Sequence, residues 1–207
     1  MTASALRANT APNPGFGDPV HDAQAVFRSV LRAMSRPGEV QDLSLDVAPP
    51  APLFPAAAGV CLALLDLDTR LWIGGCDGDA ADAAAFVAFH TGAPATDDVG
   101  QADFAVIADG MQVPALDTFR QGTDEAPENS ATVIVQVSGL DVRDGTGAWR
   151  LSGPGIDGET SLHVEGVRQN LVGDLAANRA RFPRGVDLIL CTATGIAALP
   201  RTTKVEV

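Results

Sequence analysis

Hydrophobic residues recur every three or four positions between His21 and Met34. This spacing is typical of a helix that buries one face. Asp22 stands near the start of the segment, and the sequence Ser35-Arg36-Pro37-Gly38 ends it. The residues expected on the buried face are Ala23, Val26, Phe27, Val30, Leu31 and Met34. Residues 1–20 lack this period, and we expect them to form a mobile or extended arm.

The rest of the chain alternates short apolar stretches with alanine-rich ones. The apolar and β-branched stretches predict strands at residues 39–45, 69–74, 103–108, 131–137 and 186–192. Helices are expected at residues 79–89 and 164–181. Residues 56–67 fit either a buried strand or a helix, and their alanines favour the helix. Asp144-Gly145 predicts a hairpin turn into a strand at residues 148–151, and residues 196–207 are expected to hold one or two short strands.

This order of elements predicts the fold class. Helices that alternate with fully apolar strands imply an α/β fold in which both faces of a mixed sheet are covered. A chain of 207 residues, of which 46% are hydrophobic, is large enough for one core and short for two. We therefore expect a single three-layer α/β domain over residues 21–207.

Charge narrows the range of partners. The chain carries 26 acidic and 14 basic residues, for a net charge of -12. Nucleic acids and anionic membranes bind through excess basic charge, so neither is expected as a partner. The apolar run at residues 56–65 is about half of what spans a bilayer, and residues 1–18 lack the apolar core of a signal peptide. We expect a cytoplasmic protein.

Common catalytic and cofactor motifs are missing or incomplete in the sequence. Residues 153–158 match G-x-G-x-x-G, but no apolar helix start follows, and Pro154 removes a backbone N–H that would bind pyrophosphate. A Gly-Pro-Gly turn is therefore the expected structure. The three cysteines and three histidines are widely spaced, so we expect buried thiols and no metal site.

Several residues remain as candidates for anion binding or proton transfer. Arg28, Arg32 and Arg36 recur every four residues opposite the apolar helix face, where they could bind an anion or an acidic partner, or simply face solvent. His90 ends a predicted helix, which suits an interaction with the last carbonyls or a general acid or base. Arg201 and Thr202 could bind an anion or simply end a strand.

Six short segments, in order along the chain, resemble the PhnH family of bacterial carbon-phosphorus lyase subunits. They are FRSVLRAMSRPG at residues 27–38, LLDLDT at 64–69, FHTGAP at 89–94, GPGI at 153–156, FPRGVD at 182–187 and LPRTT at 199–203. The resemblance covers the chain from about His21 to its C-terminus. Such a long ordered series makes a chance match improbable.

The resemblance implies a subunit of a core complex with four kinds of subunit. That complex transfers an alkylphosphonate to the ribose C1 of ATP and releases adenine. The family resemblance also implies a homodimer, with a fold similar to the large domain of pyridoxal-phosphate transferases. No cofactor is expected, because the single lysine, Lys204, falls in a C-terminal strand rather than in a pocket.

Two hypotheses about function follow from the resemblance. In the first, the chain is a non-catalytic accessory subunit that binds the other core subunits. In the second, it contributes residues to a shared phosphate or phosphonate site. The residues that would do so are Arg28, Arg32, His90, Arg201 and Thr202. The first hypothesis is favoured because the sequence lacks a nucleophile paired with a base, a metal cluster and a phosphate loop.

Overall fold

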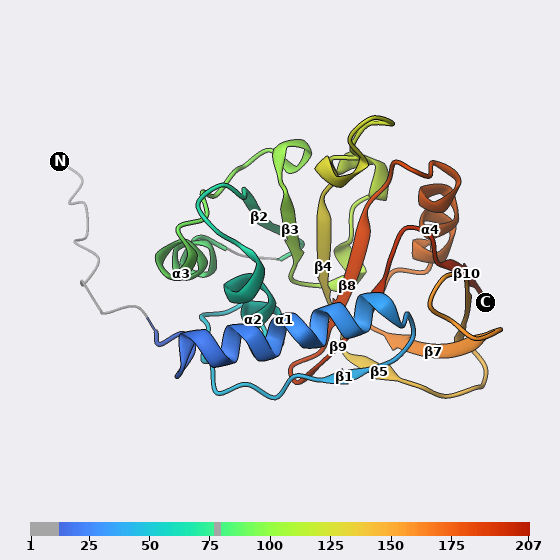
Figure 1. Ribbon diagram of the computed structural model, residues 1–207, viewed down its shortest axis with the longest axis horizontal. Helices are drawn as coiled ribbons and strands as arrows, with labels where there is room; N and C mark the ends of the chain where they lie inside the picture. Colours follow the sequence, from blue (N-terminus) through green and yellow to red (C-terminus); the bar gives the residue numbers. More distant parts are fainter. Residues whose placement is uncertain (1–12, 77–79) are drawn as a thin grey trace.

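The computed structural model describes residues 13–76 and 80–207. Its centre is a six-stranded sheet in the order β1-β9-β8-β4-β3-β2 (Figure 1). The strands are β1 (Gln41–Asp42), β2 (Leu71–Gly74), β3 (Phe104–Ile107), β4 (Thr132–Gln136), β8 (Asp187–Cys191) and β9 (Gly195–Leu199). β2, β3, β4 and β8 run parallel, whereas β9 pairs antiparallel with both β8 and β1. The predicted mixed sheet is confirmed, although the first strand has two residues instead of seven.

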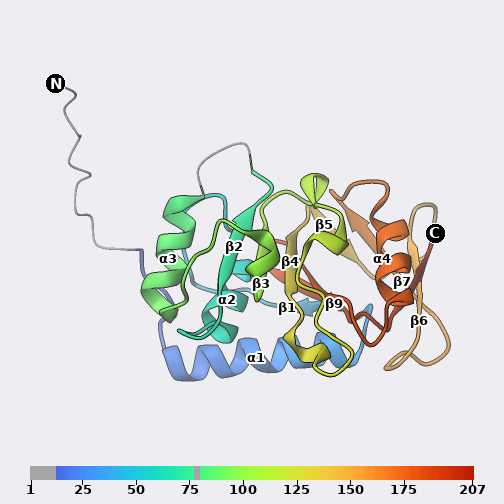
Figure 2. The ribbon, with the colours of Figure 1, turned by 90° about the horizontal axis from the view of Figure 1, so that it is seen from above.

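Three helices cover one face of this sheet (Figure 2). They are α1 (Pro19–Ser35), α2 (Pro55–Leu64) and α3 (Ala81–Thr91). α2 is apolar all round and lies in the core, with residues 56–61 fully or almost fully buried. Its small alanines allow close approach to α1 and to the sheet. The ambiguous run at residues 56–67 therefore forms the favoured helix as far as Leu64, and residues 65–67 lie beyond its end. The helix predicted at residues 79–89 is confirmed from residue 81 onward and continues to Thr91, whereas residue 79 lies outside the described residues.

A second sheet and one helix pack against the other face. The sheet has the order β10-β6-β7-β5 and is antiparallel throughout. Its strands are β5 (Gly139–Asp141), β6 (Trp149–Ser152), β7 (Thr160–Glu165) and β10 (Lys204–Glu206), and the helix is α4 (Leu171–Ala180). The short 3-10 helices are η1 (Val99–Gln101), η2 (Gly110–Gln112), η3 (Leu116–Thr118) and η4 (Pro127–Asn129).

The predicted helix at residues 164–181 was wrong at its start. Residues 164 and 165 end β7, Gly166 turns the chain with a φ of 78°, and α4 begins only at Leu171. Leu162 and Val164 are buried on one face of β7, which is the period-two pattern of a strand. Strand pairing with β5 and β6 therefore outweighs the weak helical pattern.

The predicted hairpin at Asp144-Gly145 was also wrong. β5 and β6 flank that turn in sequence, but both pair with β7, which lies between them. The hairpin instead joins β6 to β7 through the Gly-Pro-Gly segment, whose turn character is confirmed. Gly155 has a φ of 85°, and a Cβ there would lie 2.3 Å from the Ser35 carbonyl oxygen. Only glycine permits this close contact between the turn and the end of α1.

The arm expected at residues 1–20 does not extend as far as residue 20, because the segment before α1 contacts the domain. Residues 1–12 lie outside the described part of the chain, but residues 13–18 pack on the domain. The Asn13 side chain donates to the Ala48 carbonyl at 2.8 Å, and Phe16 packs against the core. α1 begins at Pro19, because the Asp18 carboxylate accepts hydrogen bonds from the first free N–H groups of the helix.

Candidate functional site

The arginines predicted to form a stripe lie on the outer surface of α1. Arg32 and Arg36 each lie 3.4 Å from Glu39, in exposed ion pairs. Arg28 is exposed and has no ion pair with any residue in the described ranges. Phe27 and Leu31, which the sequence placed on the buried face, are 45% and 52% exposed. The face of α1 that meets solvent therefore carries both apolar and basic side chains.

His90 holds the N-terminal segment against α3. Its Nε2 lies 3.0 Å from the Asn13 carbonyl oxygen, and because a carbonyl oxygen only accepts, the ring donates. The imidazole also packs edge-on against Phe86 and Phe89. His90 therefore binds the carbonyl of a distant segment instead of the last carbonyls of its own helix. It borders a cavity of about 170 Å³, next to Gly15.

Arg201 lies in the turn between β9 and β10, and all five of its guanidinium N–H groups have protein partners. Nε and Nη2 bind the Asp187 carboxylate at 3.2 and 2.6 Å. Nη1 donates to the carbonyls of Pro127 and Pro183, and Nη2 donates to the Ser130 hydroxyl. The side chain is only 12% exposed. No donor of this arginine is free for an anion unless one of these bonds breaks.

Thr202 and Thr203 follow Arg201 and are held differently. The Thr202 carbonyl accepts from Arg179 Nε at 3.2 Å, and the residue is half-buried. Thr203 is 4% exposed, and its hydroxyl has no hydrogen-bond partner in the described part of the protein. The Thr202 carbonyl therefore binds α4, and within the described residues neither threonine hydroxyl is hydrogen-bonded to Arg201.

The five candidate residues do not form one site within a single chain. Arg28 and Arg32 share one face of α1, and Arg201 and Thr202 are neighbours in one turn. His90 binds residue 13, whereas Arg201 binds the start of β8 and the loops beside it. These three groups have no hydrogen-bond partner in common.

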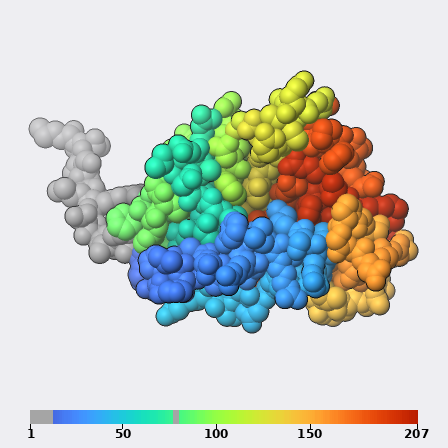
Figure 3. All heavy atoms as spheres, viewed as in Figure 1, coloured from blue at the N-terminus to red at the C-terminus, as the bar shows by residue number. Residues whose placement is uncertain are grey.

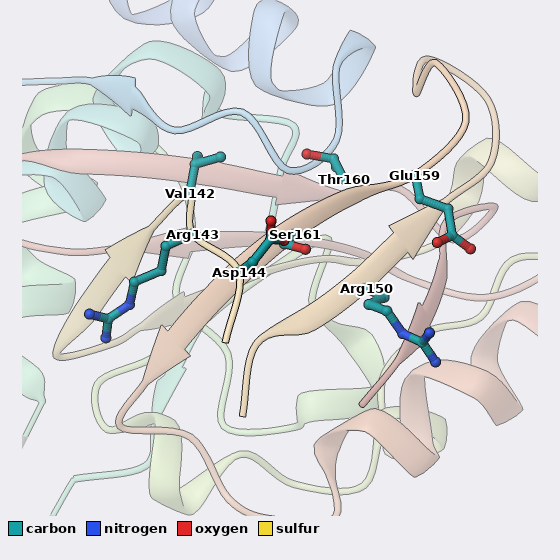
Figure 4. Close-up of a pocket in the computed structure, with 7 residues that line it drawn as sticks. All are labelled: Val142, Arg143, Asp144, Arg150, Glu159, Thr160 and Ser161. Carbon is teal, nitrogen blue, oxygen red and sulfur yellow. The ribbon is translucent and has the colours of Figure 1, made fainter. Parts of the chain in front are cut away.

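A polar pocket that the sequence reasoning missed lies on the second sheet (Figure 4). Its volume is about 390 Å³, and the lining residues are Val142, Arg143, Asp144, Arg150, Glu159, Thr160 and Ser161. Its two guanidinium groups point away from each other in Figure 4. Arg143 also forms ion pairs with Asp141 and Glu165, each at 3.5 Å. The charges of the two arginines and two acidic residues that line the pocket cancel, so the pocket lacks the excess positive charge that would attract an anion.

The sequence patterns did not predict this pocket, because part of its lining comes from β7. Residues 160–163 were not assigned to any strand, so nothing placed Thr160 and Ser161 beside Arg150. Arg150 and Ser161 are in fact paired across the two strands. An alternating pattern of Leu151, Leu162 and Val164 facing the core was the available signal, since it puts the intervening side chains on the outer face.

Open α/β sheets usually bind ligands at the carboxyl edge of the parallel strands, and in this protein side chains and loops fill that edge at the end of β4. Gln136 at the end of β4 is 2% exposed, and its Oε1 accepts from the Phe54 N–H at 2.6 Å. Its Nε2 donates to the carbonyls of Pro52 and Ala108, at 2.8 and 3.0 Å. Gly110 lies so close to the Gly166 carbonyl that a Cβ would be 2.3 Å from it. This packing gives the end of β4 a structural role.

The titratable groups within the described ranges include two buried thiols and no cluster suited to a metal ion. No three His, Cys, Asp or Glu side chains there are grouped so as to hold a metal ion. Burial raises the pKa of the Cys61 thiol to about 12, and burial also raises the pKa of Cys191. Neither thiol supplies a thiolate nucleophile near neutral pH. No helix in this part of the chain has the length and apolar character needed to cross a membrane.

Comparison with known proteins agrees with the family resemblance. The family described as bacterial phosphonate metabolism protein (PhnH) matches residues 14–206. A protein from Rhizobium meliloti (strain 1021), named alpha-D-ribose 1-methylphosphonate 5-triphosphate synthase subunit PhnH, is 41% identical over 191 residues. That match covers 92% of this chain and 94% of the relative.

A second relative, HtxG from Stutzerimonas stutzeri, is named as a C-P lyase subunit protein on a provisional basis. It is 35% identical over 194 residues, which cover 88% of this chain and 85% of the relative. The family match extends over nearly the whole domain, from the segment before α1 to β10. The chain therefore belongs to the PhnH family of bacterial phosphonate metabolism proteins.

Proposed function

We propose that this chain is a non-catalytic accessory subunit of a carbon-phosphorus lyase core complex in organophosphonate catabolism. The complex transfers an alkylphosphonate to the ribose C1 of ATP and releases adenine. The relative from Rhizobium meliloti is named as a subunit of the corresponding synthase. One observation supports the accessory role above the others. Every guanidinium N–H of the mostly buried Arg201 is bonded within the protein, so this arginine is not available to bind substrate.

The decisive experiment measures adenine release from ATP in the presence of methylphosphonate. The purified chain is assayed alone and after co-expression with the other core subunits. We expect no release above buffer from the chain alone and clear release from the assembled complex. Adenine release by the chain alone would contradict the accessory role. Failure of the chain to co-purify with the other subunits would contradict membership in the complex.

We further propose that the chain is a cytoplasmic homodimer. We also propose that the fold is similar to the large domain of pyridoxal-phosphate transferases, as the family resemblance implies, and we infer that it works without that cofactor. Lys204 supports this inference because it is exposed on β10 and lies 2.8 Å from Glu206. Sedimentation across micromolar concentrations tests the dimer, and a monomer at all of them would contradict it.

The alternative function is a direct contribution of side chains to a shared phosphate or phosphonate site. Arg28 favours it, because this arginine is exposed and has no ion pair within the described ranges. The test is the Arg28→Gln variant in the assembled complex. A raised KM for ATP or phosphonate with normal assembly would favour substrate contact. A loss of assembly would instead assign Arg28 to a subunit interface.

A further inference from the structure

Apolar side chains line one side of the exposed surface of α1. Val20, Phe27 and Leu31 are 75%, 45% and 52% exposed. Their spacing of seven and four residues places them in one stripe along the helix. A large aromatic and two aliphatic side chains in a row are an unusual surface for a chain that keeps most of its other apolar residues in two cores. Figure 3 shows α1 as a ridge across one face of the molecule.

Basic side chains run beside this apolar stripe. Arg28 and Arg32 are four residues apart on α1, and no acidic residue occurs between positions 23 and 35. Like charges at this spacing destabilise a helix. Glu39 lies near Arg32 at 3.4 Å but forms no ion pair with Arg28. In a chain with a net charge of -12, this side of α1 is a local positive surface.

The charge of this surface argues against a second copy of the same chain as its occupant. Two copies related by a two-fold axis present the same patch to each other. Arg28 and Arg32 would then lie near the same residues of the other copy, and buried like charges are costly. A different chain with acidic residues around an apolar depression removes this repulsion and covers Phe27 and Leu31.

We propose that the outer face of α1, formed by Val20, Phe27, Arg28, Leu31 and Arg32, docks another subunit of the complex through an acidic surface with an apolar centre. This inference rests on the proposed function, because it names the surface by which the accessory subunit binds. The apolar side chains supply buried area and the arginines supply orientation and specificity.

The test uses a charge reversal at Arg28, which has no ion pair to lose among the described residues. Arg28→Glu is co-expressed with the other core subunits, and its affinity for them is measured by titration. The matched control is Arg70→Glu, an equal change of charge at an exposed residue before β2 whose guanidinium donates to Gln101. We expect Arg28→Glu to weaken binding at least about 30-fold, and Arg70→Glu to weaken it less than about twofold.

A second variant probes the apolar part of the same face. Leu31→Ser is expected to weaken binding at least about tenfold while the protein keeps its circular dichroism spectrum, because half of this side chain already meets water. Binding of the unaltered chain is also expected to weaken as salt rises from about 0.05 to 0.5 M, since rim charges are screened.

The binding experiments with the α1 variants can contradict the docking surface in three ways. Normal assembly of both α1 variants, with the unaltered chain bound, overturns the docking surface. Loss of self-association with retained binding to the other subunits overturns it too, and assigns the face to a second copy. If the unaltered chain itself fails to bind the other subunits, the proposed function fails first, and the docking surface that rests on it fails as well.

Discussion

The Arg201 guanidinium and the Asp187 carboxylate form a two-point ion pair, with Nε 3.2 Å from Oδ1 and Nη2 2.6 Å from Oδ2. The backbone N–H of Arg201 donates to the same carboxylate at 2.7 Å. Asp187 is the first residue of β8, and Arg201 stands in the turn after β9. The ion pair therefore links the turn after β9 to the start of β8.

Replacement of Arg201 by alanine is expected to lower the free energy of unfolding by about 3 kcal/mol, because Asp187 loses its partner in a mostly buried place. Urea unfolding followed by circular dichroism measures the change. Arg179→Ala is the control, since this exposed arginine makes one bond to a carbonyl and should change stability by at most about 0.5 kcal/mol. If Arg201→Ala left the stability unchanged and weakened anion binding, the structural role given to Arg201 would be contradicted.

The buried amide of Gln136 should be as critical as a core side chain. Gln136→Leu leaves the Phe54 N–H and two carbonyls without partners, and we expect a loss of about 3 kcal/mol in stability. Gln112→Leu is the matched control, because its amide is exposed and Asp109 is its one side-chain partner in the described part of the chain. Equal unfolding midpoints for the two variants would contradict the role given to Gln136.

The Cys61 thiol should make stability fall in alkaline solution. Burial raises its pKa from 9.0 to about 12, so the folded protein keeps this proton where the unfolded chain has lost it. Stability is unaffected below pH 9 and then falls by about 1.4 kcal/mol per pH unit until about pH 12. Between pH 9 and 11, Cys61→Ala should lose about 2 kcal/mol less than the unaltered protein.

A control for the alkaline experiment is Val60→Ala, which also shortens a buried side chain of α2 but removes no titratable group. Its stability should fall with pH in parallel with that of the unaltered protein. Chemical unfolding at each pH gives all three curves. Parallel curves for Cys61→Ala and the unaltered protein would show that the thiol does not control this pH dependence.

Lys204 should not form a stable Schiff base with pyridoxal phosphate. It is exposed on β10, and its hydrogen bond holds the pKa of the Glu206 carboxyl below its usual value. Schiff-base lysines are activated by desolvation in a pocket, which this position lacks. After incubation with pyridoxal phosphate and borohydride, intact mass should be the same for unaltered protein and Lys204→Met, apart from the substitution. A stoichiometric adduct on Lys204 would contradict this.

Local pattern was sufficient for the elements that bury a regular face. α1 follows from its three-and-four spacing, and β3, β4 and β8 follow from short apolar runs, because burial on one or both faces leaves a direct periodic signal. The same reasoning failed at β7, where Gly166 and a polar outer face weakened the pattern. Pairing with β5 and β6 decided that segment, and such pairing is a non-local interaction.

The sequence by itself determined the α/β class, the family and the absence of a recognisable catalytic motif, because these depend on residue order and on patterns within short windows. Only the tertiary structure decided what the candidate residues do. Arg201 looked like an anion ligand in its segment, but residues 14 to 74 positions away fill its donors. Phe27 looked like a core residue, but Val26 and Val30 form the buried face of α1 and Phe27 is 45% exposed. Burial and hydrogen-bond partners arise from contacts distant in sequence, so no local pattern contains them.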